Sequence, residues 1–169
     1  MPRKSISIVI TAIFTAFILA IGGANPLKAA QDPSEADRTV PLNNAGATVV
    51  VAINKVKTGG RLFNTTCGEC HAGGGTKTNQ FVSLSPSDLA GATPSRNNIE
   101  GLVDYMKNPT TYDGKTEISD LHPSMKSTAM YPKMRNLTDD DLTAIAGYIL
   151  VQARVSGKKW GGATRFIER

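Results

Sequence analysis

Two cysteines and a histidine stand within five consecutive residues, in the order Cys67-Gly68-Glu69-Cys70-His71. Two thiols one helical turn apart can each add to one vinyl group on the same edge of a porphyrin. The next residue then places an imidazole under the iron as its proximal ligand. The pattern therefore predicts one covalently bound haem c, with Cys67 and Cys70 as the covalent anchors and His71 as an axial ligand of the iron.

Other uses of these two cysteines fit the sequence less well. A disulfide between them would close a very short loop and would stabilise the fold little. A thioredoxin-like redox pair follows a strand in a βαβ unit, whereas a helical pattern precedes Cys67 here. A zinc site of the usual four-ligand spacing is missing from the sequence. Aromatic residues make up only 6% of the chain, and a haem would add a large apolar element to so thin a core.

The second axial ligand of the iron must come from elsewhere in the chain. His122 is the second of the two histidines, and Pro123 stiffens the backbone directly after it. Met134 is a rival, because small monohaem cytochromes commonly carry their methionine ligand just before the last helix. A thioether favours Fe(II) and raises the reduction potential, while a second imidazole favours Fe(III). Spacing alone leaves both open, and the other thioether candidates are Met106, Met125 and Met130.

The hydrophobic periodicity predicts an all-α domain of three main helices around the haem, with a short β-hairpin before them. Thr138 is a good N-cap for the last helix, and the three aspartates after it suit the positive end of a helix dipole. The expected elements are strands near Thr39–Pro41 and Thr48–Val51, helices at about 52–66, about 95–107 and from 139 onward, and long loops over 72–92 and 109–137.

The first 30 residues are predicted to be a cleaved signal peptide. Arg3 and Lys4 precede an apolar stretch of about 16 residues, which is somewhat short for a membrane anchor, and small residues follow it. Cleavage could fall after Ala24 or Ala30, and Ala30 is favoured. Residues 31–169 are then expected to form one cytochrome c domain outside the cytoplasm, with an N-terminal extension and a basic C-terminal tail from residue 155.

The positive charge of the chain does not indicate a nucleic-acid-binding protein. The 169 residues carry 19 Lys and Arg against 14 Asp and Glu. Three of the basic residues lie in the predicted signal peptide, which leaves 16 against 14, and two haem carboxylates would bring the domain close to neutrality.

The residues resemble two nested families. Gly60 and Phe63 before the haem motif, with Tyr148 on the last helix, are similar to the packing residues of the class I cytochrome c fold. Nearly the whole mature chain resembles cytochrome c-550, the extrinsic haem subunit of photosystem II. The segments that carry this second resemblance include Thr76-Lys77-Thr78-Asn79, Ala92-Thr93-Pro94, the run from Asn98 to Thr110, His122-Pro123-Ser124, the run from Tyr131 to Thr138, and Lys159-Trp160-Gly161-Gly162.

The resemblance implies a binding subunit rather than an enzyme. Such a protein lies in the thylakoid lumen, peripheral to the membrane, on the lumenal face of photosystem II beside other extrinsic subunits. It stabilises the manganese-calcium cluster and its calcium and chloride requirement. The family position implies that His122 is the second ligand of a low-potential haem and that Met134 has a packing role. A soluble lumenal or periplasmic electron carrier is the alternative function, and a peroxidase would need an open iron site.

One further haem contact is expected from the polar loop after the motif. Asn79 belongs to a polar segment close in sequence to the haem ligands, and we expect its side chain to donate a hydrogen bond to a haem propionate. The alternative is an exposed, solvated loop.

Overall fold

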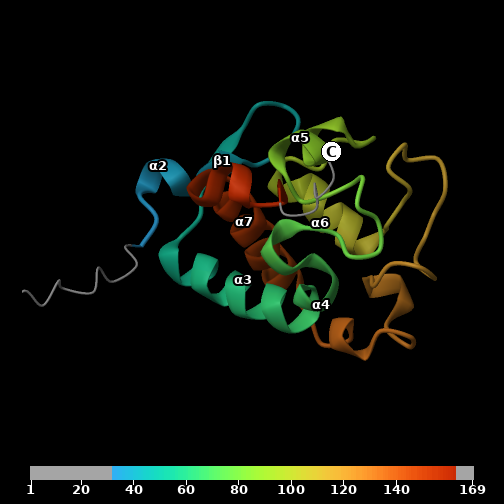
Figure 1. Cartoon of the computed structure of the whole chain (residues 1–169). Helices are drawn as coiled ribbons and strands as arrows, with labels where there is room; N and C mark the ends of the chain where they lie inside the picture. Colours follow the sequence, from blue (N-terminus) through green and yellow to red (C-terminus); the bar gives the residue numbers. More distant parts are fainter. Residues whose placement is uncertain (1–31, 163–169) are drawn as a thin grey trace, which may run out of the picture. The chain divides into compact units, whose positions relative to one another are not determined.

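The computed structural model describes residues 32–162 of the chain (Figure 1). The predicted signal peptide and the last seven residues of the basic tail lie outside this range. Among the described residues, no helix is long and apolar enough to cross a membrane. The elements in chain order are α2 Glu35–Arg38, β1 Thr39–Pro41, β2 Thr48–Val50, α3 Ile53–Thr66, α4 Gly68–His71, η1 Ala72–Gly74, α5 Pro86–Gly91, α6 Ile99–Lys107, η2 Met125–Ser127, η3 Pro132–Met134, α7 Asp139–Ser156 and η4 Gly157–Lys159.

Helices α3 and α7 pack closely against each other in the centre of the domain (Figure 1). The contact is close because two glycines of α3 face α7. A Cβ atom on Gly59 would overlap the backbone carbonyl of Ala144, and one on Gly60 would lie 3.0 Å from the ring of Tyr148. The expected pairing of Gly60 with Tyr148 is therefore confirmed.

Three aromatic rings complete this helix crossing. The ring of Phe63 lies 5.3 Å from that of Tyr148 and 5.7 Å from that of Trp160, centre to centre. Phe63 is 1% exposed and Trp160 is 5% exposed. The cluster holds the C-terminal end of α3, and with it the start of the haem motif, against α7.

Side-chain caps fix where the helices begin. Thr138 and Asp141 form a reciprocal capping box at the start of α7, as the sequence indicates. Asn98 caps α6 by accepting a hydrogen bond from the backbone of Gly101 at 2.8 Å. The helix expected over about 95–107 therefore begins only at Ile99, because the buried cap residue before it has extended backbone angles.

The predicted β-hairpin is present, with Val40 paired to Val49. The short helix α2 precedes the hairpin, because Ser34 and Asp37 form a capping box. Two expectations about loops and ends were wrong in part. Helix α5 lies within the expected loop 72–92, with Ser85 as its cap and Pro86 in its first turn. Helix α7 continues to Ser156 and ends at Gly157, so the basic tail begins later than residue 155.

Candidate haem-binding site

Cys67 caps the end of α3 and also begins the short helix α4, which carries the rest of the motif. The backbone N–H of Cys67 donates to Phe63 at 2.7 Å, and that of His71 donates to the carbonyl of Cys67 at 2.9 Å. Cys67, Cys70 and His71 therefore lie within one helical turn, the arrangement that double attachment to one porphyrin edge requires. Cys67 and Cys70 form no disulfide.

Burial makes Cys67 a poor thiolate. The pKa of the Cys67 thiol is raised to about 12, mainly because the thiol is removed from water and to a smaller extent because Cys70 is near. Attack on a disulfide needs the thiolate form, which a redox-active cysteine reaches through a lowered pKa. The surroundings of Cys67 thus argue against a thioredoxin-like exchange pair.

The structure brings the two histidines of the chain together. The imidazole rings of His71 and His122 lie 6.1 Å apart, centre to centre, with an angle of 49° between their planes. Two imidazole nitrogens bonded to one metal at about 2.0 Å each are about 4 Å apart, and each ring centre lies about 1 Å farther back, so the expected separation is roughly 6 Å. The measured separation of the ring centres is close to the one expected for two imidazoles that bind one metal ion from opposite sides.

Backbone carbonyls orient both rings for metal binding. Nδ1 of His71 lies 3.0 Å from the carbonyl oxygen of Gly75, and Nδ1 of His122 lies 2.9 Å from that of Pro123. A proton on each Nδ1 satisfies these contacts, and Nε2 then keeps its lone pair for a metal. Pro123 thus contributes through its carbonyl as well as through the stiffness expected from the sequence.

Burial also keeps both imidazoles neutral. Desolvation lowers the pKa of His71, although its contact with Gly75 acts in the opposite direction. The pKa of His122 is lowered to about 4, mainly by desolvation and to a smaller extent by the nearby His71. A neutral imidazole is the form that ligates a metal, so no proton has to be displaced from either ring.

The surroundings favour an iron within an organic ring over a bare metal ion. Within residues 32–162, no cluster of three or more His, Cys, Asp or Glu side chains could hold a metal ion. Leu121, directly before His122, is 81% exposed, and Phe81, in the loop after the motif, is 85% exposed. Two imidazoles on opposite sides, with apolar side chains near in sequence, suit a porphyrin that supplies the remaining iron ligands itself.

Met134, the rival ligand, belongs to the hydrophobic core. It lies in η3, is 3% exposed and packs within the buried cluster. This position suits the packing role that the resemblance implies for Met134. The ring of His122 lies beside that of His71, so His122 stays the predicted second ligand.

Sequence reasoning did not assign a role to one further residue beside the histidines. The ring of Tyr105, from α6, lies 4.9 Å from that of His122. Seventeen positions separate the two residues, so no local spacing rule could pair them.

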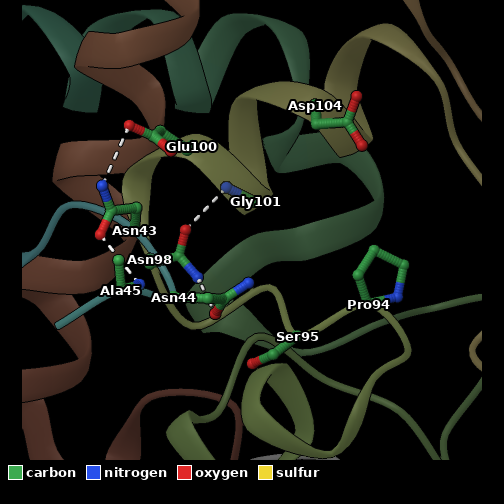
Figure 2. Close-up of a pocket in the computed structure, with 9 residues that line it drawn as sticks. All are labelled: Asn43, Asn44, Ala45, Pro94, Ser95, Asn98, Glu100, Gly101 and Asp104. Carbon is green, nitrogen blue, oxygen red and sulfur yellow. Dashed lines mark hydrogen bonds between the residues drawn. The ribbon is translucent and has the colours of Figure 1, made fainter.

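A separate pocket of about 420 Å³ lies at the start of α6 (Figure 2). Its polar side chains are engaged with one another: Asn98 donates to the side-chain oxygen of Asn44 at 2.9 Å, and Asn43 donates to Glu100 at 3.5 Å. These bonds tie α6 to the turn of the β-hairpin. None of the residues that line the pocket is a predicted haem residue, so we assign it a structural role.

Asn79 is exposed, and its side-chain oxygen accepts a hydrogen bond from the backbone of Phe81 at 3.0 Å. With the oxygen engaged in this way, the side-chain amide nitrogen of Asn79 is the atom that would donate the predicted hydrogen bond to a propionate. We expect Asn79→Ala to lower the reduction potential slightly, because loss of the donor leaves the negative propionate less stabilised and therefore favours Fe(III). Asn79→Asp should lower the potential further. Redox titration checks both variants, and unchanged potentials would assign Asn79 to a solvated loop instead.

Comparison with known proteins identifies the family. The profile of the cytochrome c-550 domain matches residues 31–167. The chain is 57% identical over 162 residues to photosystem II extrinsic protein V of Nostoc punctiforme, covering 96% of this chain and 97% of that protein. The chain belongs to the cytochrome c-550 family. The protein of the same name from Phaeodactylum tricornutum is 51% identical over the same length.

Solved structures agree with the cytochrome c-550 assignment. The crystal structure of cytochrome c549 matches with a TM-score of 0.74 at 55% identity and covers 76% of this chain and 99% of that one. The PsbV2 cytochrome of Thermosynechococcus elongatus matches with a TM-score of 0.59 at 36% identity, over 68% of this chain and 82% of that one. The class I cytochrome c fold and the covalently bound haem c are thereby confirmed.

Proposed function

We propose that this chain is an extrinsic haem subunit of photosystem II that binds on the lumenal side and stabilises the manganese-calcium cluster with its calcium and chloride. The observation that carries the proposal is the identity of 57%, over nearly the full length of both chains, with a protein named photosystem II extrinsic protein V. A lumenal location would require export of the chain. The start of the family profile at residue 31, directly after the favoured cleavage site at Ala30, supports a cleaved signal peptide.

The proposed haem ligands follow from the site geometry. Cys67 and Cys70 would hold the porphyrin through thioether bonds, and His71 and His122 would bind the iron from opposite sides. When bound, the haem supplies one-electron Fe(III)/Fe(II) chemistry at a low potential, because two imidazoles favour Fe(III) over the thioether alternative. With both axial positions taken by histidine, no site remains for peroxide, which supports a binding subunit over a haem enzyme.

Reconstitution with photosystem II tests the proposed function. We expect the mature holoprotein to bind to photosystem II membranes stripped of their extrinsic subunits and to restore oxygen evolution at low calcium and chloride. Contacts between exposed charges are screened over about 8–10 Å at physiological salt, so release should increase steeply with ionic strength. A soluble, methionine-ligated monohaem cytochrome c of similar net charge is the control. If the control restores oxygen evolution equally well, or the holoprotein does not restore it, the electron-carrier alternative is favoured.

A further inference from the structure

A ring from α6 packs against the ring of His122. Tyr105 lies 4.9 Å from His122, centre to centre, with its plane tilted by 59°. Tilted aromatic pairs at this separation attract each other beyond their hydrophobic contact. His122 is therefore held at two places, by the carbonyl of Pro123 at Nδ1 and by Tyr105 at its ring.

Tyr105 is in turn held by a buried cation. The guanidinium carbon of Arg96 lies 3.9 Å from the centre of the Tyr105 ring. The residue is only 7% exposed. One guanidinium nitrogen donates to the carbonyl oxygens of Thr110 and Thr111 at 3.1 and 2.9 Å and to the hydroxyl of Thr110 at 3.2 Å. These bonds anchor the stack to the loop that follows α6.

The protein supplies no carboxylate partner for Arg96 within residues 32–162. None of the ion pairs there includes Arg96, and its hydrogen bonds go to neutral oxygens. A positive charge in a poorly solvated position acts over a longer distance than one at the surface, where water and salt screen it. Its nearest aromatic neighbour is the ring that contacts His122.

We propose that Arg96 and Tyr105 are positioning residues for the distal haem ligand: the stacked pair fixes the orientation of the His122 ring, and the buried charge of Arg96 raises the reduction potential of the haem. The inference rests on the assignment of His122 as the second iron ligand. It adds two residues that neither touch the iron nor belong to the haem motif.

Each half of the proposal has its own physical consequence. Loss of the Tyr105 ring frees His122 to rotate and to leave the iron more often. Loss of the Arg96 charge removes a repulsion that disfavours Fe(III) relative to Fe(II), so the reduction potential falls. A purely structural role for the pair would change stability but neither the ring orientation nor the potential.

The ring is tested with Tyr105→Leu and Tyr105→Phe in the mature holoprotein. Low-spin EPR g values report the relative orientation of the two axial imidazoles, and the rate of carbon monoxide binding to the ferrous protein reports detachment of His122. We expect Tyr105→Leu to shift the g values and to raise the binding rate roughly tenfold, the size that loss of one aromatic contact supports. Tyr105→Phe keeps the ring and should restore both readouts.

The charge is tested with Arg96→Gln and Arg96→Lys. Arg96→Gln should lower the reduction potential at both low and high salt, because the charge is buried. Arg96→Lys keeps the charge but loses the planar stack. Its reduction potential should therefore lie closer to that of wild type than the potential of Arg96→Gln does, while its g values shift. Lys107→Gln is the matched control, since Lys107 lies on α6 but pairs with Asp139 at 2.8 Å. The change in reduction potential in Lys107→Gln should be small and should disappear at high salt.

The outcomes separate this inference from the proposed function. Unchanged g values in Tyr105→Leu would overturn the positioning role, and equal potentials in wild type and Arg96→Gln would overturn the charge effect. If Arg96→Gln does not fold, Arg96→Met removes the same charge with a side chain of similar length. A potential below that of Lys107→Gln at high salt then supports the charge effect, and a potential equal to that of wild type overturns it. A wild-type spectrum without two histidine ligands would instead overturn the assignment of His122, whereas reconstitution of oxygen evolution tests the function separately.

Discussion

Replacing His122 with methionine is expected to raise the reduction potential by a sizeable part of the roughly 0.8 V range over which axial ligands set haem potentials. A thioether stabilises Fe(II) relative to an imidazole, so the ferrous form becomes easier to reach. The same variant should gain the long-wavelength charge-transfer band that marks a bond between methionine sulfur and Fe(III), which wild type should lack. Redox titration and absorption spectroscopy of the holoprotein measure both changes.

Met134→Ala is the matched control for this experiment. Met134 is 3% exposed, so its truncation should lower the free energy of unfolding by about 2–5 kcal/mol through lost packing. The axial spectrum and the potential should stay as in wild type. A charge-transfer band in wild type that disappears in Met134→Ala would move the second ligand from His122 to Met134.

The parts of this site that depend on neighbouring residues could be predicted from the sequence. Cys67, Cys70 and His71 lie within one turn because Cys67 caps the short helix α4 that carries the other two, and no distant contact is needed to place them. The start of α7 is local in the same way, because Thr138 and Asp141 cap it reciprocally. Local physical chemistry decides both features, so spacing rules are enough.

The parts that depend on tertiary contacts could not be predicted in this way. Spacing left His122 and Met134 open as ligands, and the resemblance to cytochrome c-550 favoured His122 before the ring geometry was known. Arg96 and Tyr105 lie nine positions apart and meet because the loop before α6 folds back over the helix that carries Tyr105. Helix α5 was missed because its six residues are too few for a hydrophobic period, although Ser85 and Pro86 are a usable start signal.

Gly59→Ala is expected to destabilise the protein by about 3 kcal/mol, at the upper end of the usual cost of overpacking. In an open helix the same change would be favourable by about 1 kcal/mol, because alanine is the better helix former. At this position the new Cβ atom would overlap the backbone carbonyl of Ala144 and would lie 3.0 Å from Cβ of Tyr148. Backbone cannot move aside as a flexible side chain can, so α3 and α7 must separate.

Gly68→Ala is the control, because its Cβ atom would meet only ordinary contacts, the nearest at 3.7 Å. Denaturant unfolding of the holoprotein, in which the haem is already attached, gives the free energy of each variant. We expect Gly68→Ala, at the start of α4, to be as stable as wild type or more stable by up to about 1 kcal/mol, because alanine is the better helix former. Equal stability of the two variants would mean that the α3–α7 crossing accommodates a methyl group.

Because the motif follows α3 directly, separation of the helices in Gly59→Ala should also shift the position of His71 relative to His122. Its haem should therefore bind carbon monoxide faster than that of Gly68→Ala.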